Sequence, residues 1–128
     1  MASTVPEGTA SKAATPEPSF ETADDIVVGL VTAKDQAEGE KVAEMLVKQK
    51  LVACVNILPA VRSVYMWKGD MQKDSEVLLV MKTRKQLQGR VTAAVVQAHS
   101  YDVPEVIFTP LLGGYGPYLN FVRENTSD

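Results

Sequence analysis

The stretch LVACVNILPAVRSVYMWKGDMQKDSEVLLVMKT, residues 51–83, decides the fold. Apolar, β-branched and aromatic residues fill it on both sides of Lys68-Gly69-Asp70. A glycine at that point supplies the positive φ that a tight hairpin needs, so two strands are predicted to meet there. Strands in small domains usually have about five or six residues, and these two would be more than twice as long. We therefore expect a hairpin that projects past any helix able to cover it.

A projecting hairpin of this composition needs a partner. Its strand edges carry unpaired backbone groups, which invite pairing with another strand. Pro59 cannot donate to a ladder and predicts a bulge or bend in the first long strand. We expect other copies of the same chain to complete the structure.

The segments that flank the hairpin predict further strands and helices. Residues 26–32 form a β-branched run typical of a strand covered on both faces. Asp35 and Glu38 have capping-box spacing, so a helix should begin there and end near Lys50, with Gly39 as its weak point. A second capping box at residues 83–86 should open another helix, whose apolar positions follow helical spacing. Those positions are Leu87, Val91, Ala94, Val95 and Ala98.

The last part of the chain completes a recognisable order of elements. Residues 103–109 predict a short strand, residues 113–116 a loop, and Pro117 the first turn of a closing helix. The order β-α-β-β-α-β plus a short C-terminal helix predicts an α+β, ferredoxin-like split βαβ fold. Right-handed crossovers place both helices on one face of its antiparallel sheet. The opposite face, which carries Tyr65 and Trp67, has no helix to cover it, and this again predicts an oligomer.

Composition and charge narrow the class of protein. Residues 1–25 carry five acids and one base, are rich in Ala, Ser, Thr and Pro, and hold a single aromatic residue, so we expect a disordered acidic tail ahead of one domain over residues 26–128. That domain is nearly neutral, without the basic stripe of a nucleic-acid binder or a membrane-surface helix. A single cysteine is typical of a reducing compartment. We expect a cytoplasmic protein, or one of the plastid stroma if a transit peptide has been removed.

Several motifs together resemble one known family. They are Ala53-Cys54-Val55-Asn56-Ile57-x-Pro59, Ser63-x-Tyr65-x-Trp67-x-Gly69, Lys82-Thr83, His99-x-Tyr101-Asp102-Val103-Pro104-Glu105 and Tyr118-Leu119. In this order and with these gaps they resemble the CutA divalent-cation-tolerance family over about residues 26–124. The resemblance implies a compact homotrimer in which the long hairpins extend the sheets of neighbouring subunits. It also implies a role in copper tolerance and binding, with no established enzymatic activity.

The resemblance carries a metal site over only in part. Bacterial members have been assigned a cysteine late in the first strand and two adjacent histidines before the Tyr-x-x-Pro-Glu motif. His99 matches the second histidine, whereas Ala98 and Val31 stand at the other two positions. His99 is therefore the candidate ligand for Cu(II), alone or with a neighbouring subunit's acids. The alternative is a structural histidine at a helix C-terminus.

The remaining candidates are expected at clefts between subunits. Lys82, Glu105 and Tyr118 would line a cleft for a small anion or metabolite, or form charge pairs that hold the trimer together. Tyr65 and Trp67 would be buried subunit anchors, or a platform for a ligand. Asp102 joins this group, but residues three apart on a strand face opposite sides, so it should not act as an acid–base pair with Glu105.

Cys54 is also expected at the clefts between subunits, and it has three interpretations. It could be a soft metal ligand, a nucleophile with His99 as its base, or a buried thiol that packs as a small hydrophobe. Its apolar neighbours favour the last, and we predict no catalytic residue.

The predicted function is divalent metal ion tolerance and copper homeostasis by a trimer. The alternative is a trimeric signalling or scaffold protein that binds a small molecule or protein at its subunit clefts, with no metal role. An RNA-binding pattern of aromatics and a phosphate-binding glycine loop after the first strand are both missing.

Overall fold

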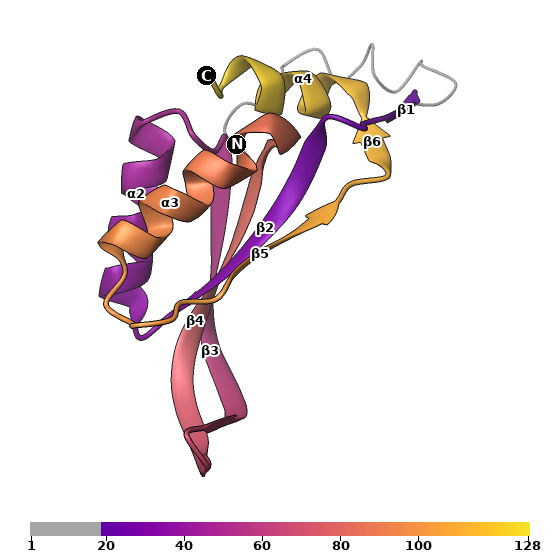
Figure 1. Ribbon diagram of the computed structural model, residues 1–128. Helices are drawn as coiled ribbons and strands as arrows, with labels where there is room; N and C mark the ends of the chain where they lie inside the picture. Colours follow the sequence, from indigo (N-terminus) through magenta and orange to yellow (C-terminus); the bar gives the residue numbers. More distant parts are fainter. Residues whose placement is uncertain (1–18) are drawn as a thin grey trace.

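The computed structural model describes residues 19–128, which form two sheets and three α-helices. A four-stranded antiparallel sheet has the order β3-β4-β2-β5. It consists of β2 (Ile26–Ala33), β3 (Cys54–Trp67), β4 (Asp70–Arg84) and β5 (Val106–Pro110). Helices α2 (Gln36–Lys48) and α3 (Gln88–Ala98) cover one face of this sheet (Figure 1). The expected ferredoxin-like α+β fold is confirmed.

The long hairpin is present and projects past both helices (Figure 1). Lys68 and Gly69 form its turn with φ of 51° and 86°, the left-handed pair typical of a type I′ turn. The expected bulge lies at Pro59 and Ala60, where the register between β3 and β4 shifts and Ala60 has a φ of 62°. The first strand of the hairpin begins at Cys54, since residues 51–53 form a buried loop instead.

The core lies between the sheet and the two covering helices. Helix α2 begins as predicted, because the Asp35 side chain accepts a hydrogen bond from the Glu38 amide. Gly39, predicted as a weak point, is instead a point of close packing, where an added Cβ would lie 2.9 Å from Val77. Twelve buried residues form the main cluster. They are Val31, Ala33, Val42, Leu46, Leu51, Val52, Val77, Leu79, Met81, Leu87, Val91 and Val95.

Two expectations around α3 are wrong. The capping box at residues 83–86 does not form, because Thr83 belongs to β4 and its hydroxyl donates to the carbonyl of Leu51. A short 3-10 helix (Lys85–Leu87) leads into α3 instead. Ala98 is exposed rather than part of the apolar stripe, because α3 ends there.

The segment that precedes β2 contains a strand. We expected disorder through residue 25, but β1 (Phe20–Thr22) pairs with β6 (Gly113–Tyr115), the segment predicted as a loop. Backbone pairing does not require the apolar side chains that a compositional prediction counts. Asp25 also forms a salt bridge with Arg123 in the closing helix α4 (Gly116–Glu124), with 2.7 Å between Nε and Oδ2. Most of the expected tail, residues 1–18, lies outside the described residues.

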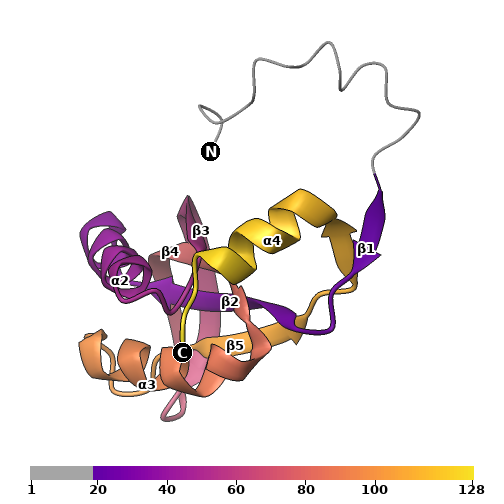
Figure 2. The same cartoon turned by 90° about the horizontal axis from the view of Figure 1, so that it is seen from above.

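The end of the molecule opposite the hairpin tip is closed by α4 and the β1–β6 pair, as Figure 2 shows from above. A small second cluster packs beneath α4, formed by Ala23, Ile26, Ala53, Leu119 and Val122. The sheet face that points away from α2 and α3 has no such cover within the described chain.

Candidate functional site

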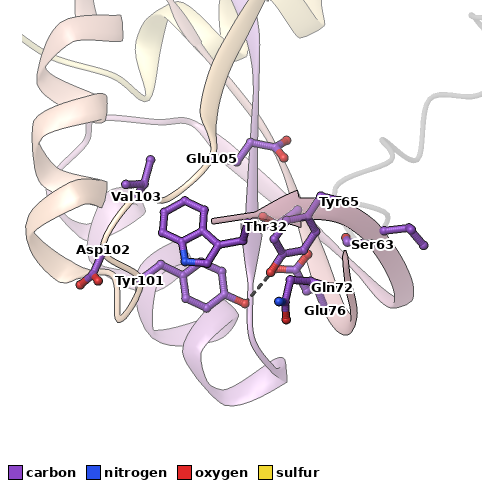
Figure 3. Close-up of a pocket in the computed structure, with 11 residues that line it drawn as sticks. Thr32, Ser63, Tyr65, Gln72, Glu76, Tyr101, Asp102, Val103 and Glu105 are labelled. Atoms are coloured by element: carbon purple, nitrogen blue, oxygen red, sulfur yellow. Dashed lines mark hydrogen bonds between the residues drawn. The ribbon is translucent and has the colours of Figure 1, made fainter. Parts of the chain in front are cut away.

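A groove of about 690 Å³ lies where the hairpin leaves the body of the molecule. One wall is the distal half of the hairpin, and the other is the segment between α3 and β5 (Figure 3). Tyr65, Glu76 and Thr32 belong to neighbouring strands on the open side of the sheet. The full lining is Thr32, Ser63, Val64, Tyr65, Trp67, Gln72, Glu76, Tyr101, Asp102, Val103 and Glu105.

Tyr101 and Glu76 form the polar centre of the groove. The Tyr101 hydroxyl donates to Glu76 Oε2 at 2.8 Å, the bond drawn in Figure 3. Glu76 is only 7% exposed, so this hydrogen bond offsets part of the cost of burying its carboxylate. Burial, and then the adjacent Glu76 carboxylate, raise the pKa of Tyr101 well above its usual value. The hydroxyl therefore stays protonated as a donor.

Tyr65 makes a second tyrosine–carboxylate pair on the hairpin. Its hydroxyl lies 2.5 Å from Asp74 Oδ2, and this hydrogen bond raises the pKa of Tyr65. Both Tyr65 and Trp67 are 42% exposed, so they are accessible on the single chain.

His99 is held by the backbone on both sides of its ring. Nδ1 accepts from the Tyr101 amide at 3.1 Å, since an N–H can only donate. Nε2 therefore carries the proton and donates to the Thr32 carbonyl at 2.7 Å. The side chain is 9% exposed and its ring lies 4.6 Å from that of Tyr101. His99 thus positions Tyr101 against the end of β2.

This arrangement does not fit a Cu(II) site. Both imidazole nitrogens of His99 already have partners, so no free lone pair faces a metal. Val31, at another family ligand position, is apolar and fully buried. Within residues 19–128, no three His, Cys, Asp or Glu side chains converge as metal ligands would. Metal ligation by His99 would require one of its two hydrogen bonds to break.

A second polar cluster lies at the other end of the sheet. Cys54 and Lys82 are direct partners in the β3–β4 ladder, and Lys82 Nζ donates to Asn56 Oδ1. Tyr118 from α4 lies beside Cys54, and burial, followed by this thiol, raises the pKa of Tyr118 to about 12. Cys54 and His99 do not form a nucleophile–base pair, since His99 is bonded to Thr32 and Tyr101.

The predicted cleft residues therefore form two groups on one chain. Tyr65, Trp67, Asp102 and Glu105 line the groove. Cys54, Lys82 and Tyr118 form the second cluster. Cys54 and Trp67 are the two ends of β3, which puts them roughly 40 Å apart along the strand.

Sequence reasoning missed Glu76, Thr32 and Tyr101 as groove residues. Glu76 follows Asp74-Ser75 in a polar stretch of β4, and nothing in that stretch predicts that its carboxylate is buried. Tyr101 lay within the quoted His99–Glu105 motif, which was the available signal. Its partner is 25 residues away, so the contact depends on the tertiary fold.

The fold and groove define a class of α+β, ferredoxin-like proteins with a projecting hairpin, and comparisons give the family. The sequence model of the family described as "CutA1 divalent ion tolerance protein" matches residues 27–125. This chain belongs to that family.

Individual relatives agree. The chain is 46% identical to "Protein CutA, chloroplastic" of Arabidopsis thaliana over 86% of this chain and 60% of the relative. It is 37% identical to the "Divalent-cation tolerance protein CutA" of Thermus thermophilus, over 77% of this chain and 96% of that one. The crystal structure of CutA1 from Oryza sativa superposes with a TM-score of 0.80 at 41% identity, covering 84% of this chain and 99% of that chain. The chain spans about 60% of the length of the plant relatives it matches.

Proposed function

We propose that this protein acts as a homotrimer in tolerance to divalent cations, copper(II) included, and that it does so without catalysing a reaction. The family name and the names of relatives such as the Thermus thermophilus protein support the role in cation tolerance. The uncovered sheet face supports the homotrimer, and it is the single structural observation on which the proposed assembly rests.

The uncovered face bears a continuous apolar surface. Leu30, Val80 and Ile107 are neighbours on three adjacent strands, and Leu78 and Leu58 form the next row. Ile107 is 53% exposed and Leu58 is 42% exposed. A monomer would leave this surface in water, whereas packing against another copy would bury it at about 25 cal/mol per Å².

The hairpin gives the oligomer a second contact. Its distal half has two free strand edges and exposed apolar side chains at Val64, Met66 and Met71. Neighbouring subunits that pack around such hairpins would border the groove. Such packing would also bring the cluster of Cys54, Lys82 and Tyr118 on one subunit close to the groove of a neighbouring subunit. Within one chain the cluster and the groove lie at opposite ends of β3.

The alternative is a trimer that binds a small molecule or a protein at these clefts and has no metal role. The geometry of His99 favours this second candidate, because its ring nitrogens are used within the fold.

For the compartment, the sequence predicts the cytoplasm, with the plastid stroma as the alternative. The relatives "Protein CutA, chloroplastic" of Arabidopsis thaliana and "Protein CutA 1, chloroplastic" of Oryza sativa support the alternative. None of the helices in residues 19–128 combines the length and apolar character that crossing a bilayer requires.

Copper titration separates the two candidates. CuCl₂ is titrated by calorimetry into the wild type, His99→Ala and the exposed-site control Gln97→Ala at equal protein concentration. Saturable binding at a fixed ratio supports the metal role, and no binding supports the alternative. We expect His99→Ala to leave copper binding unchanged but to lower stability by about 2 kcal/mol, since it removes two partly buried hydrogen bonds. Binding that is lost only in His99→Ala would contradict the structural role given to this residue.

A further inference from the structure

We propose that the groove binds a small organic cation with N–H donors, such as a guanidinium or primary ammonium compound. The inference rests on the second candidate function, a trimer that binds a small molecule at its clefts, and takes the groove as that site. It adds the chemical class of the ligand.

The charge of the lining selects the sign of the ligand. Glu76, Asp102 and Glu105 line the groove, and no lysine, arginine or histidine does. Asp74 and Glu38 add to the negative field, since both contribute to the raised pKa of Tyr101. A cation entering this groove is attracted from several sides, whereas an anion is repelled.

The aromatic residues supply a surface suited to an organic cation. Tyr65, Trp67 and Tyr101 line the groove from both walls. Cations bind over such rings, most strongly over tryptophan. Lys68 Nζ lies 5.6 Å from the Trp67 ring centroid, so this ring already holds a cation of the chain, and a ligand bound there would take the place of that ammonium group.

The carboxylates differ in availability. Glu76 is occupied by the Tyr101 hydroxyl, and this bond fixes the tyrosine ring in place. Asp102 and Glu105 are exposed, and within residues 19–128 their side chains take part in no hydrogen bond or salt bridge. They are acceptors for the N–H groups of a guanidinium, which pairs with carboxylates in a fixed planar geometry.

The size and geometry argue against a bare metal ion. A groove of about 690 Å³ lies within the usual range for small-molecule sites, roughly 300 to 1,000 Å³. Metal ligation needs several oxygens on one point, and no such convergence of three acids occurs within residues 19–128.

Trp67 makes the test direct, since it is the only tryptophan of the chain. Its emission is followed in the full-length protein while n-butylguanidinium chloride is added, with the neutral isostere n-butylurea as the matched probe. We expect a saturable change with the guanidinium and none with the urea. Glu105→Gln and Asp102→Asn should each weaken binding about fivefold, as expected for one partly exposed charge-assisted hydrogen bond. Glu44→Gln on the outer face of α2 is the control and should bind as the wild type does.

Several results would overturn the inference. One is an equal response to n-butylurea, and another is binding that Glu105→Gln and Asp102→Asn leave unchanged. A response to ZnCl₂ without one to the guanidinium would assign the groove to a metal. No response in a protein of trimer mass would mean that a neighbouring subunit fills the groove. Light scattering on the same samples separates these outcomes from failure of the proposed trimer, which would show as a monomer mass.

Discussion

At the scale of single residues, the polar contacts join distant parts of the chain to the groove. His99 connects the end of α3 to β2, and Tyr101 connects the following segment to β4. The family resemblance predicted Asp102, Glu105, Tyr65 and Trp67 as cleft residues, but not that these four line one groove of a single chain. The role of Glu76 could not be predicted, because the burial of a carboxylate depends on which side chains pack above it.

The Tyr101–Glu76 pair predicts that the free energy of unfolding falls as the pH rises into the alkaline range. The pKa of Tyr101 is raised in the folded state above its unfolded value of about 10. This contribution is fully present below that pH and is lost as the pH rises, because the unfolded tyrosine ionises first. Wild type should therefore lose more stability between about pH 9 and about pH 11 than Tyr101→Phe does.

The measurement is urea unfolding across that pH range. Near neutral pH, Tyr101→Phe should itself cost about 1–3 kcal/mol, since Glu76 loses its donor. Tyr115→Phe, at an exposed position, is the control and should follow the wild type. Equal alkaline losses in wild type and Tyr101→Phe would contradict the pairing.

At the scale of elements, the sequence pattern predicted the main strands and helices, but it predicted their ends less accurately. The helical spacing of Leu87, Val91 and Val95 correctly identified the buried face of α3. The capping box at residues 83–86 failed because Thr83 bonds to Leu51, 32 residues away. The β1 and β6 strands each have three residues, too few for a side-chain pattern to reveal.

Gly69 in the hairpin turn and Gly89 in α3 form a matched pair of glycines. An added Cβ would meet open space at both Gly69 and Gly89, so crowding affects neither. Gly69 has a φ of 86°, whereas Gly89 lies within α3. Gly69→Ala should therefore destabilise the protein by about 1 kcal/mol through backbone strain. Gly89→Ala should stabilise it by up to about 1 kcal/mol through helix propensity.

Thermal and urea unfolding of the two variants provide the check. A Gly69→Ala variant as stable as the wild type would mean that the turn adopts another conformation in solution.

At the scale of the whole molecule, the uncovered sheet face and the hairpin predict assembly. Both features could be anticipated from the sequence, since helices were too few to cover two faces. Which side chains meet across an interface could not, because a single chain does not specify the arrangement of its neighbours.

Substitutions at two similarly exposed residues test where the proposed interface lies. Ile107 on the open sheet face is 53% exposed and Val96 on α3 is 50% exposed. If the protein is a monomer, Ile107→Asp and Val96→Asp should have similarly small effects on its stability and on its mass in solution. In the proposed trimer only Ile107→Asp places an unpaired charge in an apolar contact, and it should weaken association at least about tenfold. Dissociation is measured by sedimentation at a series of concentrations, and equal effects of the two variants would place the interface elsewhere.

The most direct test of the proposed trimer is the mass of the wild-type protein in solution at micromolar concentration, by light scattering after size exclusion. We predict a single species with three times the mass of the 13.9 kDa chain. A mass equal to that of one chain would contradict it, because the apolar sheet face and the hairpin would then remain in water.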